Sequence, residues 1–146
     1  MTAIIRISSK CLYACKALVA LAGLKRDEML QLSDIARIQG IPERFLAHVL
    51  VSLKRKAIVK SERGKNGGYR LGRSPRSILL GEVVDAVCEI SGSPRKGRSK
   101  KVPESSDSWR LEELILAQWD KAGSSFLQTL NKLSLEDMVG YLDNTR

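Results

Sequence analysis

The stretch that decides the fold is VKSERGKNGGYRL, which runs from Val59 to Leu71. Apolar and polar residues alternate at both of its ends, as they do in strands that are buried on one face. Between these ends, Asn66, Gly67 and Gly68 readily adopt the positive φ angles that the tip of a hairpin requires. The stretch therefore predicts a β-hairpin.

The tip of this predicted hairpin is basic. Arg63 and Lys65 lie in it, and Glu62 is the only acidic residue beside them. A cationic, flexible hairpin tip suits contact with phosphate groups or with the minor groove of DNA. The alternative is a solvated turn that happens to be basic.

The positive charge of the chain is concentrated around the hairpin. The whole chain carries 25 Lys and Arg against 16 Asp and Glu, for a formal net charge of +9. Residues 44–76 hold ten basic residues and one acid, whereas residues 104–146 hold four basic and eight acidic residues. One basic segment between less basic flanks favours binding to a nucleic-acid backbone. A membrane surface is the competitor, but it usually requires a basic amphipathic helix, which this segment does not clearly offer.

Length and composition exclude several classes of protein. The 146 residues, 43% of them hydrophobic, suffice for one compact domain or for a small domain with a long extension. No apolar run is long enough to cross a bilayer and no signal-peptide pattern is visible, so we expect a soluble, cytoplasmic protein. We expect no enzyme, because the chain has one histidine and shows neither a nucleophile–base pair nor a phosphate-binding motif.

Three helical patterns precede the hairpin. The first helix is expected to begin at Ser8 or Ser9 and to end near Gly23, and a second, short helix runs over residues 33–40. Pro42 fits the first turn of a third helix, residues 43–56. The predicted buried stripe of the third helix consists of Phe45, Leu46, Val49, Leu50 and Leu53. A short helix, a glycine-containing turn, a longer helix and a basic hairpin follow one another as in a winged helix-turn-helix.

In such a fold the third helix enters the major groove and the hairpin is the wing. Arg44 and His48 lie four residues apart on the exposed face of that helix. Arginine can read guanine through two hydrogen bonds, and histidine can donate to a base or a phosphate. The alternative for both is an ordinary surface side chain. The predicted DNA-binding residues are Glu43, Arg44, Ala47, His48, Arg63, Gly64, Lys65, Asn66, Gly67 and Tyr69.

The C-terminal part of the chain has a different pattern. A fourth helix at residues 80–88 closes a DNA-binding domain over residues 1–90, and residues 91–108 form a basic, flexible loop rich in Ser, Pro and Gly. Residues 109–133 then read as a long helix whose apolar residues step by four and three, as in a heptad seam.

We expect the seam to pair with the same helix of a second chain, because a small domain has little core left to cover it. Packing back within one chain is the alternative. The predicted dimerisation residues are Trp109, Ile115, Trp119, Ala122, Phe126 and Leu130. Ser134 caps a last short helix over residues 135–142, which completes a dimerisation region over residues 109–146.

The chain resembles the Rrf-two family of bacterial winged-helix repressors over nearly its whole length. The resemblance is carried above all by RGKNGGYRL, residues 63–71, and by GEVVDAV, residues 81–87; residues 32–36 and 41–53 add to it. It implies a homodimer that reads a pseudo-palindromic operator, with recognition helices in major grooves and wings in minor grooves. Ala47 departs from the family, because several relatives carry a base-reading glutamate at this place.

The cysteines are the second departure. Cluster-binding members of the family carry three cysteines in the loop after the fourth helix, and residues 91–108 contain none. The resemblance therefore implies a regulator without a cofactor, with an iron–sulfur cluster as the alternative. It is nearest to the cysteine-metabolism repressors, which work with a cysteine synthase, so a metabolic enzyme is a further partner to consider. The chain ends in DNTR instead of the isoleucine that such a partner engages.

Cys11, Cys15 and Cys88 are the only cysteines, and their odd number without a CxxC pair argues against a disulfide scaffold. Cys11 and Cys15 lie one helical turn apart, and we expect them to be small buried hydrophobes. The alternative is a thiol sensor at Cys88, or a metal or redox site that joins Cys88 to this pair. A protein-interaction module that regulates a partner enzyme is the remaining alternative function.

Overall fold

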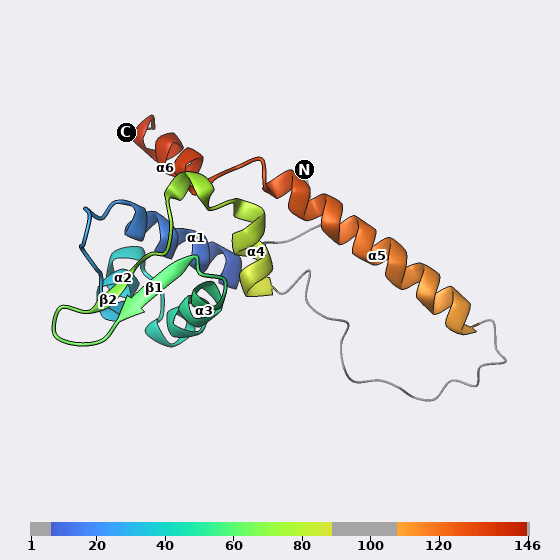
Figure 1. Cartoon of the computed structure of the whole chain (residues 1–146), viewed down its shortest axis with the longest axis horizontal. Coiled ribbons are helices and arrows are strands. Elements are labelled where there is room, and N and C mark those ends of the chain that lie inside the picture. The colour runs from blue at the N-terminus through green and yellow to red at the C-terminus, as the bar shows by residue number, and fades with distance from the viewer. Residues whose placement is uncertain (1–6, 89–107, 146) are drawn as a thin grey trace.

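The computed structural model describes residues 7–88 and 108–145 of the chain (Figure 1). Helices dominate these residues, and the only sheet among them is a two-stranded antiparallel hairpin. The predicted fold class, a winged helix-turn-helix with a long C-terminal helix, is confirmed. The elements in chain order are α1 (Ser9–Ala22), α2 (Leu32–Gln39), α3 (Glu43–Arg55), β1 (Val59–Glu62), β2 (Gly68–Leu71), the 3₁₀ helix η1 (Pro75–Ser77), α4 (Leu80–Cys88), α5 (Ser108–Leu130) and α6 (Leu135–Asp143).

Helix α1 lies at the centre of the hydrophobic core. The Ser8 hydroxyl caps the helix by accepting a hydrogen bond from the Cys11 backbone N–H. Ala14, Ala17 and Leu18 are fully buried on the inner face, and helices α2, α3, α4 and α6 all pack against α1. The small side chains of the two alanines let these helices approach closely, so α1 sets the positions of the others.

The turn between α2 and α3 is sharp. Gly40 ends α2 in the left-handed conformation, with a φ of 62°. Pro42 directly precedes α3 and is its N-cap residue, whereas the sequence placed it inside the first turn. Helix α2 begins at Leu32, one residue before the Ser33 that the sequence suggested.

The predicted burial of one residue on α3, Phe45, is wrong. Leu46, Val49, Leu50 and Leu53 are buried, but Phe45 has 56% of its surface exposed. Successive residues of a helix are 100° apart, so Phe45 lies at the edge of the arc that these four side chains define. The burial of Leu46 fixes the direction of that arc and leaves the Phe45 ring on the rim.

The hairpin pairs Val59 with Leu71 and Glu62 with Gly68, which leaves residues 63–67 at its tip. Leu30, in the segment before α2, adds two backbone hydrogen bonds to Tyr69, of 2.7 and 3.0 Å. Gly68 has a φ of 144°, and a Cβ on it would lie 2.5 Å from the Leu30 carbonyl oxygen. Glycine is therefore required at the point where the hairpin meets the body of the protein.

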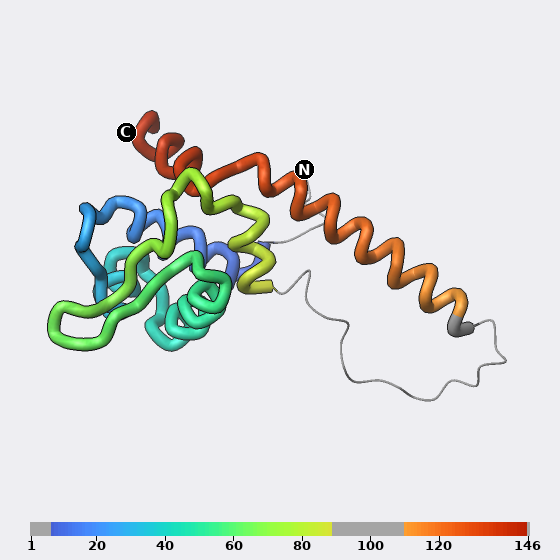
Figure 2. Tube along the Cα trace, in the orientation of Figure 1, coloured from blue at the N-terminus to red at the C-terminus, as the bar shows by residue number. Residues whose placement is uncertain are grey.

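The C-terminal helices share the same core. Leu135 of α6 is fully buried, and Phe126, Leu127 and Leu130 of α5 pack partly against the core. Gly81 allows the close approach of α4 to α5, because a Cβ on it would lie 2.6 Å from the Leu127 carbonyl oxygen. The N-terminal part of α5 projects away from this core, as the orange segment of Figure 2 shows.

The long helix is shorter than the sequence predicted, because α5 ends at Leu130 and not at Leu133. A turn follows, and a capping box formed by Ser134 and Asp137 starts α6. The predicted basic loop covers residues 91–108. Residues 91–107 lie outside the described residues, and Ser108 is the first residue of α5. Among the described residues, none of the helices is both long enough and apolar enough to span a membrane.

The contact between Gly68 and Leu30 predicts the effect of a substitution. Gly68→Ala should lower the free energy of unfolding by about 2–3 kcal/mol, because alanine is strained at this φ and its methyl group meets a backbone oxygen. Gly140→Ala is the control, since an added Cβ there has no neighbour within 4 Å. Urea denaturation of both variants checks this, and equal midpoints would contradict it.

Candidate nucleic-acid interface

The exposed face of α3 carries a row of side chains that are free to contact a ligand. Arg44 and His48 are exposed as predicted, and Val51 and Arg55 continue the row at helical spacing. Val51 has 48% of its surface exposed and was not among the predicted residues, although its spacing from Arg44 and His48 would have revealed it. Glu43 is also exposed, and Ala47 is half-buried.

The wing presents its charges at the tip. Arg63, Gly64, Lys65 and Asn66 are exposed, and Gly67 is half-buried. Within the described part of the chain, no hydrogen bond or ion pair engages the side chains of Arg63 and Lys65. Both cations are therefore available for an external anion.

Tyr69 differs from the other predicted wing residues. Its ring is half-buried and packs against the hydrophobic core, and its backbone pairs with Leu30. The structure therefore gives Tyr69 an anchoring role at the base of the wing. It does not place this residue at the tip with Arg63 and Lys65.

Polar contacts fix the wing relative to α3. Lys54 Nζ, on α3, donates to Ser61 Oγ on β1 at 2.6 Å. Glu62 is neutralised by Arg70, at 3.2 Å across the hairpin. The only acid of the basic segment is thus paired inside the wing, and the tip keeps its positive potential.

The base of the wing is tied to α4 by a second ion pair. Arg73 contacts both carboxylate oxygens of Glu82 at 3.1 Å and also donates to the Ser77 carbonyl oxygen. Glu82 in turn accepts from the Leu79 backbone N–H at 3.1 Å, at the start of α4. Both contacts to Glu82 come from one nitrogen, Arg73 Nη2, whereas Nη1 donates to Ser77.

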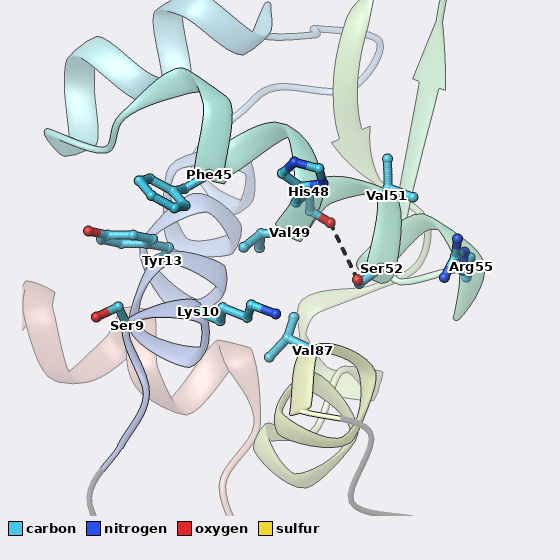
Figure 3. Close-up of a pocket in the computed structure, with 10 residues that line it drawn as sticks. All are labelled: Ser9, Lys10, Tyr13, Phe45, His48, Val49, Val51, Ser52, Arg55 and Val87. Atoms are coloured by element: carbon cyan, nitrogen blue, oxygen red, sulfur yellow. Dashed lines mark hydrogen bonds between the residues drawn. The ribbon is translucent and has the colours of Figure 1, made fainter. Parts of the chain in front are cut away.

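A hollow of about 630 Å³ lies beside the exposed face of α3. Figure 3 shows the Phe45 ring near Tyr13 of α1 in this hollow, and the Ser52 hydroxyl donating to the His48 carbonyl oxygen. The residues that line it are Ser9, Lys10, Tyr13, Phe45, His48, Val49, Val51, Ser52, Arg55 and Val87. The exposed Phe45 thus belongs to a groove between α1, α3 and α4.

The predicted dimerisation residues fall into two groups. Ile115, Trp119 and Ala122 are exposed, and Trp119 has 77% of its surface exposed. Phe126 and Leu130 pack partly on the core of their own chain. The alternative prediction, packing within one chain, expected this of the whole helix. The side chain of Trp109 lies outside the described part of the chain. Leu111, Leu114 and Leu116 add to the exposed apolar surface of α5.

These features define a winged helix-turn-helix protein of the DNA-binding class. The family model Rrf2, described as an iron-dependent transcriptional regulator, matches residues 7–141. The chain belongs to the Rrf2 family of transcriptional regulators, which confirms the resemblance seen in its sequence. The matched proteins are regulators and not enzymes, as expected.

Individual relatives agree with this assignment. An rrf2-like HTH-type transcriptional regulator of Rhodobacter capsulatus is 34% identical over 137 residues, which are 91% of each chain. An HTH-type regulator of Mycobacterium tuberculosis is 30% identical over 92% of this chain and 81% of its own. The IscR structure of T. potens matches with a TM-score of 0.68 at 26% identity and covers 98% of this chain and 92% of its own. CymR of B. subtilis, at 24% identity and a TM-score of 0.65, has the same fold over 94% of this chain and 98% of its own.

The iron-dependent description of the family raises the question of a metal site. Among the described residues, no three His, Cys, Asp or Glu side chains are grouped so that they could hold a metal ion. Cys11 Sγ and Cys88 Sγ are 2.8 Å apart. No third ligand joins this pair among the described residues, so the pair alone does not make up a metal site there.

The unpaired cations of the wing generate a prediction about DNA affinity. Arg63→Ala should weaken binding to every DNA sequence by ~1–3 kcal/mol and reduce the slope of log affinity against log salt by about one, because one phosphate contact is lost. Fluorescence anisotropy at several salt concentrations measures both quantities. Lys132→Ala removes the same charge in the turn between α5 and α6 and is the control. An identical loss in both variants would argue against a contact specific to the wing.

Proposed function

We propose that the chain is a sequence-specific DNA-binding repressor that acts as a homodimer in the cytoplasm, without an iron–sulfur cluster. Helix α3 enters the major groove and the wing enters the adjacent minor groove. The observation that carries this proposal is the joint exposure of Arg44 and His48 on α3 and of Arg63 and Lys65 on the wing. The absence of acids at the wing tip adds to it, since a phosphate backbone is polyanionic.

The major-groove role rests on the N-terminal half of α3. Arg44 is exposed one residue after the start of this helix, where side chains of a recognition helix meet base edges. Its guanidinium can donate two hydrogen bonds to the O6 and N7 acceptors of one guanine. Ala47 has no polar group to contribute, so specificity depends on Arg44, on His48 and on the apolar Val51, which suits a thymine methyl group.

The homodimer is supported by the projecting part of α5. Leu111, Ile115 and Trp119 are each more than half exposed and follow one another every four residues, so they share one face of the helix. Soluble monomers rarely leave a contiguous apolar stripe of this kind in water. A second copy of the same helix is the partner that matches this stripe in length and pattern. A two-fold dimer then presents two DNA-binding domains to a palindromic operator.

Sequence-specific binding is tested by selection from a random DNA library with the full-length protein. The wild type should enrich a palindromic sequence, and Arg44→Ala should lose preference at one base position of each half-site, by ~1–3 kcal/mol. Arg63→Ala should keep the preference and bind more weakly throughout. Selection of no common sequence by the wild type would overturn the proposal.

The dimer is tested by analytical ultracentrifugation. Ile115→Glu should raise the dissociation constant of the dimer at least about a hundredfold. Each of the two chains would bring one buried glutamate charge into the interface. Ala117→Glu adds the same charge on the other side of α5 and should leave the dimer intact. A wild-type chain that sediments as a monomer, or two variants that behave alike, would contradict this interface.

A further inference from the structure

Two of the three cysteines meet although 77 positions separate them in the sequence. Cys11 lies in the first turn of α1, and Cys88 is the last residue of α4. Their Sγ atoms are 2.8 Å apart and share a thiol–thiol hydrogen bond. Cys15, one turn further along α1, is half-buried, and no hydrogen bond to its thiol is found among the described residues.

Ser8 contacts both sulfur atoms of this pair. Its hydroxyl donates to Cys11 Sγ at 3.2 Å and lies 3.5 Å from Cys88 Sγ. The same oxygen caps α1, so the position of the hydroxyl is fixed by the helix. A donor held in this way stabilises a thiolate at Cys11 when one forms.

The two thiols differ in their access to solvent. Cys88 is exposed, whereas only 3% of Cys11 is exposed. Burial, together with the hydrogen bond to Cys88, raises the pKa of Cys11 to about 11. Cys11 is therefore a protonated, shielded thiol at neutral pH, and Cys88 is the member of the pair that meets an oxidant in solution.

We propose that Cys11 and Cys88 form a reversible disulfide site that hydroperoxides such as hydrogen peroxide oxidise. A disulfide has an S–S bond of about 2.04 Å, so the two sulfur atoms need to move together by less than about 1 Å. This movement lies within the reach of side-chain adjustment.

The oxidation proceeds in two steps. The Cys88 thiolate attacks one oxygen of the peroxide, the O–O bond breaks, hydroxide leaves, and Cys88 becomes a sulfenic acid. The Cys11 sulfur then attacks the Cys88 sulfur as its thiol proton is lost, the S–O bond breaks, and water leaves. Two thiols lose two electrons in total, and one hydrogen peroxide is reduced to two water molecules. A low-molecular-weight thiol reverses the bond by exchange.

The bond would tie the beginning of α1 to the end of α4. Both helices pack against α3, and Ser9, Lys10 and Val87, beside the two cysteines, line the hollow next to the exposed face of α3. Closing a loop of this length constrains the unfolded chain strongly. The oxidised protein should accordingly be more heat-stable than the reduced one.

The experiment uses the full-length, reduced protein without DNA, so its result is independent of whether the chain binds an operator. After treatment with hydrogen peroxide, alkylation should count one free thiol where the reduced chain has three, and peptide mapping should link Cys11 to Cys88 within one chain. The melting temperature should rise on the order of 10 °C and return on reduction.

Three variants separate this site from other thiol chemistry. Cys15→Ala is the matched control and should keep both the bond and the rise in melting temperature. Cys88→Ser should lose both, and in Cys11→Ala the sulfenic acid of Cys88 should persist and be trapped by dimedone. Three free thiols after oxidation, a bond that includes Cys15, or a bond between two chains would each overturn the proposal.

Discussion

The position of the wing depends on the backbone contact between Leu30 and Tyr69. A two-stranded hairpin is marginally stable by itself, and this one gains a third strand-like neighbour through two hydrogen bonds to the segment before α2. The contact is possible only because Gly68 has no side chain and tolerates a positive φ. With Tyr69 and Leu71 packed on the core, the tip of the wing then has a defined place relative to α3. The glycine pair of the wing therefore serves the attachment of the hairpin as well as its turn.

The ion pairs around this attachment sort the charges of the basic segment into two groups. Arg70 is paired with Glu62 across the hairpin, whereas Arg73 is paired with Glu82 of α4 and Lys56 with Asp85 of α4 at 3.9 Å. Such partly exposed pairs contribute little to stability individually. The cations at the tip and on the outer face of α3 have no such partner among the described residues. The basic residues of segment 44–76 thus include cations that are paired within the protein and cations that face outward.

Local patterns in the sequence were sufficient for most elements. Alternation and glycines predicted the hairpin, and helical spacing with capping residues predicted α1, α3, α4 and α6 to within one or two residues. The pattern could not assign Phe45, because a residue at the edge of a helical stripe is buried or exposed according to the neighbouring helix. It also could not divide α5, since a seam that meets a partner and one that meets its own core have the same spacing. The meeting of Cys11 with Cys88 is a tertiary contact, and no local signal in the sequence carries it.

The division of α5 has a consequence for the operator. Its C-terminal half, with Phe126 and Leu130, is fixed on the core, and its N-terminal half is the part proposed to pair. The crossing point of two such helices would therefore set the distance and the rotation between the two DNA-binding domains of a dimer. A half-site separation of about 34 Å, one turn of DNA, would have to be matched by this helix alone. One residue inserted between the two halves of α5 would rotate a DNA-binding domain by about 100° around the helix axis and shift it by about 1.5 Å. The length of this helix would therefore be a measure of operator spacing.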